Sequence, residues 1–273
     1  MILRVGLVQT TTGIDPAAEA TALATAIAAL AADGAQIVFT PEMSGYLDRD
    51  RKRAKATVRG EADDPVLAAV RQAARDNKVW VHLGSLALDA GDALFANRGF
   101  VIDDTGEIRG RYDKIHLFDV TLPGGESYRE SAAYRPGESA TMVAMPWGGL
   151  GMTICYDLRF PHLHASLARA GATLLSVPAA FTRPTGAAHW HILLRARAIE
   201  TGCFVIAAAQ TGIHADGRAT FGHSLVVAPW GEVLLDMGED AGTAIIDIDL
   251  DAVDEARGKV PALDHARPFA LPE

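Results

Sequence analysis

Three side chains of types that can move protons, carry fixed charge or act as a nucleophile stand directly after predicted strands. They are Glu42, Lys114 and Cys155, and each follows an apolar or alternating run of residues. In open α/β sheets, sites form outside the carboxyl ends of the strands, so these groups can meet at one edge. Taken one by one, they could supply a thiol nucleophile, a proton-transferring carboxylate and a cation.

Cys155 stands at a predicted strand-to-helix turn, because it follows the run 149–154 and Pro161 can occupy the first turn of the next helix. Backbone N–H groups and the positive end of a helix dipole would favour a thiolate there and stabilise an oxyanion. The alternative is a buried structural cysteine. The second cysteine, Cys203, opens an apolar strand and is expected in the core.

Glu42 and Lys114 are ambiguous when each is considered alone. A carboxylate beside buried apolar surface can exchange protons near neutral pH. Glu42 could equally be a solvated loop acid, and Lys114 a solvated surface charge.

The nine histidines carry no specific signal for a metal site. His162 and His164 are two residues apart, as are His189 and His191, and on a helix that spacing points the rings to different faces. A metal-binding pair prefers a separation of four. Neither GxxxxGK[ST] nor GxGxxG occurs, so no phosphate-binding loop is predicted.

Composition excludes several classes of protein. The 273 residues include 25 Lys and Arg against 34 Asp and Glu, and a net charge of −9 argues against a basic nucleic-acid-binding face. Two cysteines make neither a disulfide scaffold nor a four-thiolate zinc site. No window approaches the ~20 apolar residues of a membrane helix, and no signal peptide is recognisable. We expect a soluble cytoplasmic protein without membrane or nucleic-acid partners.

The first 40 residues predict a βαβ unit with parallel strands. Residues 2–9 form a strand-like run, Asp15 and Pro16 open an Ala-rich helix, Gly34 is placed to end it, and residues 36–39 form the next strand.

Further elements follow in the same alternation. In chain order the patterns predict a helix over 65–76, a strand over 79–88, a hairpin of 98–103 with 107–111, a strand over 149–154, a helix over 160–170, a strand over 172–177, a helix over 187–201, a strand over 203–209, a hairpin of 223–228 with 232–236, a strand over 244–248 and a short helix near 251–257.

The predicted strands and helices are too numerous for a single sheet. The economical arrangement is an α/β fold of two mixed sheets packed together with helices outside. No low-complexity linker divides the chain, so we expect a single domain over 1–273, with a C-terminal extension from about residue 250. Residues 119–140 lack periodicity and predict a long loop, and such loops are usually functional or disordered.

The order of motifs along nearly the whole chain resembles the nitrilase superfamily of carbon–nitrogen hydrolases. The matching segments are Thr40-Pro41-Glu42, YDKIHLFDV at 112–120, CYDLRFP at 155–161, Ala188-His189-Trp190, LRARAIE at 194–200, Gly222-His223-Ser224 and Pro229-Trp230-Gly231.

This resemblance implies a catalytic triad of Glu42, Lys114 and Cys155 and a four-layer α-β-β-α sandwich. The family often has a second glutamate in the loop after the lysine. Glu130 is its best match here, and Glu126 is a weaker competitor. The Cys-bearing helix would pack at the interface of a homodimer or a higher homo-oligomer.

The segment 207–214, followed by Arg218, is most similar to the deaminated glutathione amidase branch, and the ω-amidase branch is a near relative. Two residues depart from the usual pattern: His191 stands where that branch shows glutamate, and His162 where Phe-Pro-Glu-Leu is usual. Both departures bear on substrate choice.

The implied activity is hydrolysis of a small, anionic, keto-acid-like amide through a thioester, with no metal or organic cofactor. Alternatives are an ω-amidase, a general aliphatic amidase, a histidine-metal hydrolase, or a non-catalytic binding protein on the same fold. The candidate substrate-binding residues are Tyr46, Tyr156, Arg159, Thr182 and Arg183.

Overall fold

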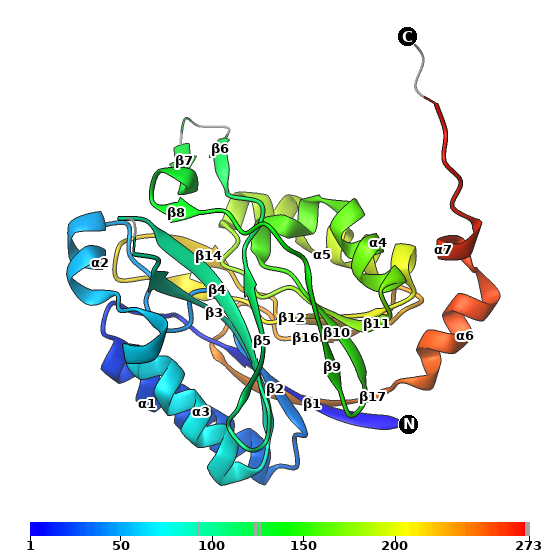
Figure 1. Cartoon of the computed structure of the whole chain (residues 1–273), viewed down its shortest axis with the longest axis horizontal. Helices are drawn as coiled ribbons and strands as arrows, with labels where there is room; N and C mark the ends of the chain where they lie inside the picture. The colour runs from blue at the N-terminus through cyan, green and yellow to red at the C-terminus, as the bar shows by residue number, and fades with distance from the viewer. Residues whose placement is uncertain (92, 123–124, 126, 271–273) are drawn as a thin grey trace.

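The chain folds into two mixed β-sheets that pack against each other between outer layers of helices, as the sequence predicts (Figure 1). The structure is a computed structural model that describes residues 1–91, 93–122, 125 and 127–270. Within these residues, no helix is both long enough and apolar enough to cross a membrane.

The first sheet runs in the order β17-β1-β2-β3-β4-β5, with β8 paired to β4. Strands β1, β2 and β3 are parallel, which confirms the predicted βαβ unit. The strands of this sheet are β1 (Ile2–Gln9), β2 (Ile37–Phe39), β3 (Trp80–Asp89), β4 (Phe95–Ile102), β5 (Ile108–Asp113), β8 (Tyr134–Arg135) and β17 (Gly242–Asp249).

The second sheet runs in the order β16-β15-β12-β11-β10-β9, and its central strands β10, β11 and β12 are parallel. Its strands are β9 (Thr141–Met145), β10 (Gly148–Met152), β11 (Ala172–Ser176), β12 (Phe204–Ala207), β15 (Leu225–Val227) and β16 (Val233–Asp236). Two separate ribbons pair β6 (Asp119–Thr121) with β7 (Ser127–Arg129), and β13 (Thr211–Ile213) with β14 (Ala219–Phe221).

Helices α1 and α3 cover the first sheet, and α4 and α5 cover the second (Figure 1). After α7 the chain extends away from the body. The helices are α1 (Pro16–Ala32), α2 (Arg51–Thr57), α3 (Pro65–Asn77), α4 (Pro161–Arg169), α5 (Arg183–Thr201), α6 (Asp251–Lys259) and α7 (Ala262–His265), with 3₁₀ turns η1 (Glu61–Asp63), η2 (Glu130–Ala132) and η3 (Cys155–Arg159).

Local sequence explains the limits of α1. The Asp15 side chain accepts a hydrogen bond from the Ala17 N–H, and Pro16 occupies the first turn. Leu23 and Ile27 are buried on the face toward the sheet. Gly34 follows the helix at φ +89°, a conformation that glycine adopts without steric cost.

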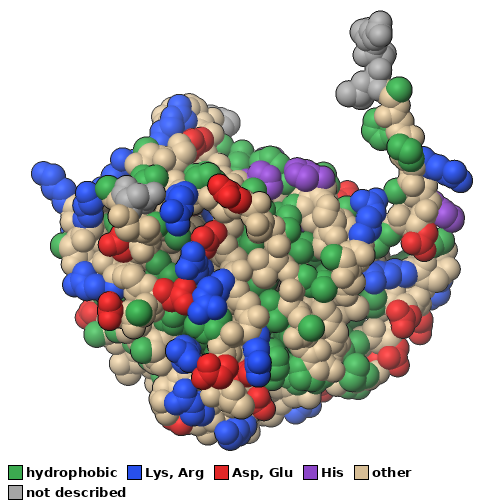
Figure 2. Space-filling view, viewed as in Figure 1, with side chains coloured by type: hydrophobic (Ala, Val, Ile, Leu, Met, Phe, Trp, Pro, Cys, Tyr) green, Lys and Arg blue, Asp and Glu red, His purple; other side chains and the backbone are tan. Residues whose placement is uncertain are grey.

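The main apolar core lies between the two sheets, where Leu7 and Phe39 of the first sheet join the same buried cluster as Leu174 and Val205 of the second. Helices α4 and α5 extend this cluster outward. On the face in Figure 2, acidic and basic side chains are interspersed over the part of the molecule around α2 and β5.

The structure corrects several element predictions. Helix α2 was not expected, because its sequence RKRAKAT lacks apolar periodicity, but the Asp50 side chain caps the N–H groups of Lys52 and Arg53. Strands β9, β13 and β14 and helix α7 were also not predicted.

Two predicted boundaries were wrong as well. Helix α5 begins at Arg183 rather than 187, because Pro184 serves in its first turn. The predicted loop 119–140 contains β6, β7, η2 and β8 among its described residues.

Candidate active site

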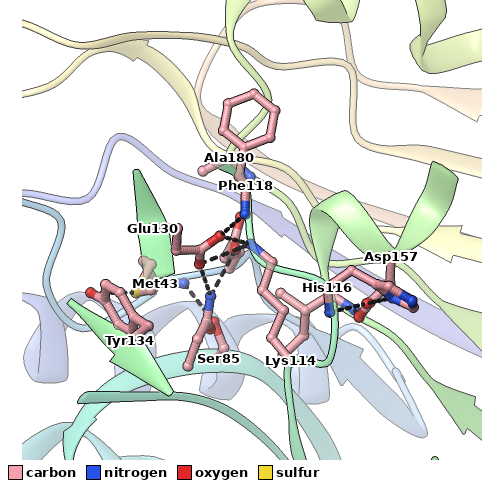
Figure 3. A network of polar contacts seen from close by, with 12 residues as sticks. Met43, Ser85, Lys114, His116, Phe118, Glu130, Tyr134, Asp157 and Ala180 are labelled. Carbon is pink, nitrogen blue, oxygen red and sulfur yellow. Dashed lines mark hydrogen bonds and ion pairs between the residues drawn. The ribbon is translucent and has the colours of Figure 1, made fainter. Parts of the chain in front are cut away.

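A cavity of about 350 Å³ opens where several strands end, and Glu42, Lys114, Glu130 and Cys155 all line it. Glu42 comes from the turn after β2, Lys114 follows β5 directly, and Cys155 follows β10. Glu130 is supplied by the 3₁₀ turn η2. The structure thus brings together all four residues that the resemblance singled out, and Figure 3 shows how Glu130 and Lys114 face each other.

Glu42 is held from three directions and is only 4% exposed. Its Oε2 accepts a hydrogen bond from the Ala180 N–H at 2.9 Å, and its Oε1 accepts one from Asn97 Nδ2 at 2.9 Å. The next residue, Met43, has φ +57° and donates its N–H to Ser85 Oγ at 3.0 Å. The carboxylate is therefore fixed in direction before any substrate arrives.

Lys114 forms two buried ion pairs at the base of the cavity. Its Nζ donates to Glu42 Oε1 at 2.9 Å and to the two carboxylate oxygens of Glu130 at 3.0 and 2.9 Å. Burial works against the charged amine, but the carboxylates of Glu130 and Glu42 outweigh it and raise the pKa of Lys114 well above its usual value. The site therefore keeps a permanent ammonium group between two carboxylates.

Cys155 begins the 3₁₀ turn η3 with a left-handed backbone, φ +51°, which is uncommon for a residue with a side chain. Its N–H donates to the Pro178 carbonyl at 2.9 Å. Burial, followed by repulsion from Glu42, raises the pKa of the Cys155 thiol well above its usual value, and Lys114 only partly offsets this.

The turn geometry that favours a thiolate is opposed here by burial of the sulfur. Helix α4 begins only at Pro161, and burial outweighs any effect of the helix end. A raised pKa favours the protonated thiol, so any attack by the sulfur of Cys155 would need a base to remove its proton.

Glu130 gives the long segment after Lys114 its structural role. Besides the ion pair with Lys114, its Oε2 accepts a hydrogen bond from the Phe118 N–H at 2.6 Å. Asn97 Nδ2 lies 3.4 Å from Glu130 Oε1 and so joins the two carboxylates of the site. Glu126 lies outside the described residues.

Sequence reasoning missed two supporting residues. Asn97 is fully buried on β4, and a polar amide beside Arg98 in a largely apolar strand was the signal that could have found it. Asp157, two residues after the nucleophile, is also fully buried. Its Oδ2 accepts from Tyr112 Oη at 2.7 Å and from the Ile154 N–H at 2.9 Å.

The other oxygen of Asp157 binds the segment just after Lys114. Its Oδ1 accepts from the His116 N–H at 3.1 Å and lies 2.7 Å from His116 Nδ1 (Figure 3). The His116 ring in turn stacks on Phe160 with centroids 3.5 Å apart. One carboxylate therefore ties the lysine-bearing chain to the cysteine-bearing turn.

The predicted substrate-binding residues divide into two groups. Tyr46, Tyr156 and Thr182 line the cavity, whereas Arg159 and Arg183 are not among the described lining residues. The Arg159 guanidinium lies over the Phe181 ring at 5.5 Å, and the Arg183 side chain is directed toward the Thr220 carbonyl and Glu239. The described lining instead contains four other arginines, Arg49, Arg51, Arg129 and Arg218.

Neither residue that departs from the amidase pattern lies in the described lining of the cavity. His191 Nε2 lies 3.0 Å from Asp236 Oδ2, and His223 Nδ1 lies 2.9 Å from Asp236 Oδ1, so two half-buried histidines and one exposed carboxylate form a cluster of possible metal ligands. His162 packs edge-on against the ring of His116 at 5.8 Å.

Known proteins match this chain along most of its length. The family model for carbon-nitrogen hydrolases matches residues 4–258. The chain is 42% identical over 238 residues to a deaminated glutathione amidase of Yersinia enterocolitica, covering 86% of this chain and 82% of that protein. It is 39% identical over 240 residues to the deaminated glutathione amidase of Bos taurus, covering 86% and 73%.

Solved structures of carbon–nitrogen hydrolases have the same fold as this chain. The NitFhit protein of C. elegans superposes with a TM-score of 0.90 at 38% identity over 97% of this chain, which spans 65% of that longer chain. An amidase from Nesterenkonia sp. superposes with a TM-score of 0.80 at 29% identity, with 95% of each chain covered.

The chain belongs to the carbon–nitrogen hydrolase family of the nitrilase superfamily, and it is an enzyme of that family. Within the family it is similar to the deaminated glutathione amidases.

Proposed function

We propose that the chain is a cysteine-dependent amidase that hydrolyses a small anionic amide through a thioester on Cys155. The observation that carries the proposal is the convergence of Glu42, Lys114, Glu130 and Cys155 at the base of one cavity. In a solved structure of a mutant amidase from Nesterenkonia sp. AN1, acrylamide has added to the active-site cysteine, which supports a cysteine nucleophile in this fold.

In the first half of the reaction, Glu42 removes the thiol proton as the sulfur of Cys155 attacks the amide carbon. The carbonyl π electrons move onto oxygen, giving an oxyanion and a protonated Glu42. When the tetrahedral intermediate collapses, the C–N bond breaks and Glu42 returns its proton to the departing nitrogen. The products of this half are a free amine or ammonia and a thioester.

In the second half, Glu42 removes a proton from water as the water oxygen attacks the thioester. Collapse of that intermediate breaks the C–S bond, releases the acid, and leaves the thiolate to recover its proton from Glu42. Neither half calls for a metal ion or an organic cofactor. Because the resting thiol is protonated, this proton cycle restores the starting state.

The oxyanion requires donors that are already in place. The Lys114 ammonium lies beside Cys155 and keeps its charge through the cycle. The Cys155 N–H is engaged by the Pro178 carbonyl and the Asp157 N–H by the Ile154 carbonyl, and the Tyr156 N–H stands between them at the start of η3. Lys114 and the Tyr156 N–H are thus the proposed oxyanion donors, and Glu130 orients Lys114.

Replacement of the nucleophile tests the mechanism. Cys155→Ala should abolish amide hydrolysis, because it removes the attacking sulfur. The denaturant unfolding curve should stay close to that of the parent protein, because only one buried thiol group is lost. Cys203→Ala is the matched control, since Cys203 is also buried but lies in the core just before β12. Continued turnover by Cys155→Ala would overturn the mechanism.

The substrate class is tested by a panel of amides scored for product. We expect deaminated glutathione to be hydrolysed with the highest kcat/KM, with Tyr46, Tyr156 and Thr182 contacting it in the cavity. A preference for α-ketoglutaramate would indicate an ω-amidase, and one for simple neutral amides an aliphatic amidase. No hydrolysis of any member, together with Cys155 labelled no faster than Cys203 by an electrophile, would indicate a binding protein.

We further propose that the chain forms a homodimer through the outer face of α5, which packs beside the helix after Cys155, α4, that the resemblance places at the interface. Ile192 is 70% exposed and Ile199 is 54% exposed on that helix, and Trp230 is 55% exposed on the adjoining turn between β15 and β16. Large apolar side chains gathered in this way are typical of interaction surfaces. Light scattering should give the mass of a dimer, and Ile192→Glu should shift it toward the monomer; a monomeric parent protein would contradict the proposal.

A further inference from the structure

Two histidines and a carboxylate from three separate segments meet at one point of the surface. His191 lies on helix α5, His223 lies between β14 and β15, and Asp236 ends strand β16. One ring nitrogen of each histidine and one carboxylate oxygen all lie within 4.8 Å of one another. None of the three is among the described lining residues of the cavity that holds Cys155. The cluster is therefore separate from the proposed catalytic site.

The Asp236 carboxylate reaches both imidazole rings. His191 Nε2 lies 3.0 Å from Oδ2, and His223 Nδ1 lies 2.9 Å from Oδ1 and 3.1 Å from Oδ2. The two rings meet edge-on, with centroids 5.1 Å apart. Zinc binds nitrogen and oxygen ligands at about 2.0–2.2 Å in a tetrahedral arrangement, so its ligand atoms are about 3.4 Å apart. Small rotations of these three side chains would therefore admit an ion between them.

The surrounding backbone holds two of the three groups in place. His223 has φ +55°, its N–H donates to the Gly238 carbonyl at 2.6 Å, and its carbonyl accepts from Trp190 Nε1 at 2.8 Å. The Gly238 N–H donates to Asp236 Oδ1 at 2.9 Å, and the Phe221 ring stacks on the His223 ring at 4.5 Å. Ligands that are fixed by such outer contacts bind metal with less loss of conformational freedom.

The cluster is both partly buried and open to solvent. The His223 side chain is 21% exposed, and those of Asp236 and His191 are 34% and 36% exposed. An ion can therefore enter, and a water molecule can complete its coordination. One carboxylate and two imidazoles, on a chain with a net charge of −9, also favour a cation electrostatically.

We propose that His191, His223 and Asp236 bind a divalent transition-metal ion of the zinc type, with water as the fourth ligand. Imidazole nitrogens suit zinc, whereas Mg²⁺ and Ca²⁺ prefer sites made of oxygen ligands. The ion links helix α5 to the strands β14, β15 and β16, so it stabilises the folded chain. This inference does not depend on the proposed amidase function.

Calorimetric titration of zinc into the full-length Cys155→Ala variant tests the site. This variant is used because the thiol in the cavity then cannot take the ion, and a pH of about 8 keeps free imidazole neutral. We expect one ion per chain. His191→Ala in the same background should weaken zinc binding more than about 100-fold, since losing even a group behind a metal ligand costs about 10- to 100-fold.

His189→Ala is the matched control. His189 is an exposed histidine on the same helix, and its ring lies beside Arg159 rather than beside a carboxylate. This substitution should leave the affinity for zinc unchanged. Mg²⁺ should give the same titration with and without His191→Ala, because the site has too few oxygen ligands for it.

Thermal unfolding gives a second readout of the same site. Excess zinc should raise the Tm of the Cys155→Ala variant and of its His189→Ala derivative, but not that of its His191→Ala derivative. His191→Ala is chosen over His223→Ala because alanine suits a helix, whereas the left-handed backbone at His223 makes misfolding a risk. An absence of zinc binding, an affinity unchanged by His191→Ala, or one ion per two chains would overturn the proposal.

Discussion

Replacing Asp157 with asparagine should separate the two halves of the catalytic site without removing any group that touches substrate. The carboxylate accepts from Tyr112 and Ile154 on one oxygen and binds the backbone and ring of His116 on the other. Asparagine keeps the shape and one acceptor oxygen. Whichever way the amide turns, its NH₂ group faces a backbone N–H, that of Ile154 or that of His116, and the remaining bonds lose their charge assistance.

The size of the effect follows from these contacts. Losing charge assistance on two bonds costs about 1 kcal/mol each, and one unsatisfied buried donor costs about 1–3 kcal/mol, so the free energy of unfolding should fall by about 3–5 kcal/mol. Since the carboxylate ties the chain after Lys114 to the turn that carries Cys155, a shift of about 1 Å between them should lower kcat about 100-fold with little change in KM.

The assay combines urea unfolding with steady-state kinetics at a temperature where the variant is fully folded. Asp103→Asn is the matched control, because Asp103 is equally buried and accepts bonds from Thr105 and Glu107 in a hairpin away from the cavity. It should lose stability and keep its kcat within about two-fold. A parental kcat in a destabilised Asp157→Asn would refute the positioning role and leave only a structural one.

Three further predictions concern the charged and buried groups. Glu42→Gln should lower kcat by about 10²- to 10⁴-fold, because it removes the proposed base; a parental pH–rate profile in this variant would contradict that role. Lys114→Met leaves two buried carboxylates facing each other and should cost about 3–5 kcal/mol of unfolding free energy at pH 7, and an unchanged unfolding curve would show that the ion pairs are not formed. Burial lowers the pKa of His82 to about 3 and of His164 to about 4. Their contribution to the free energy of unfolding is therefore complete above the histidine pKa of the unfolded chain, about 6.5, and is lost as the pH falls below that value. These two groups should make the protein about 4 kcal/mol less stable at pH 5 than at pH 8, which urea titrations can measure, and a flat profile would refute it.

Much of the fold could be predicted from local patterns. The βαβ unit, the Asp104–Gly106 hairpin and the helices that cover the sheets all follow from apolar periodicity and from cap and turn residues. Helix α2 could not be found in this way, because it buries only Ala54 and is stabilised by its Asp50 cap.

The order of motifs predicted the residues that meet in the cavity and are proposed as catalytic, but it could not predict their protonation states. Whether Cys155 rests as a thiol depends on how deeply it is buried and on which charges face it, and both depend on chain segments far apart in sequence. The same holds for the arginines: Arg159 and Arg183 were chosen for their position in sequence, whereas the cavity wall contains Arg218 because a later ribbon folds over it.

The partitioning of the acyl group between water and hydroxylamine tests the central claim most directly. Amides and N-alkyl amides that share one acyl group but differ in leaving group are hydrolysed at a fixed hydroxylamine concentration. If all pass through one thioester on Cys155, the ratio of hydroxamate to carboxylate is the same for every leaving group, and Cys155→Ala forms neither product. A ratio that changes with the leaving group would contradict a common acyl-enzyme and the mechanism proposed for this site.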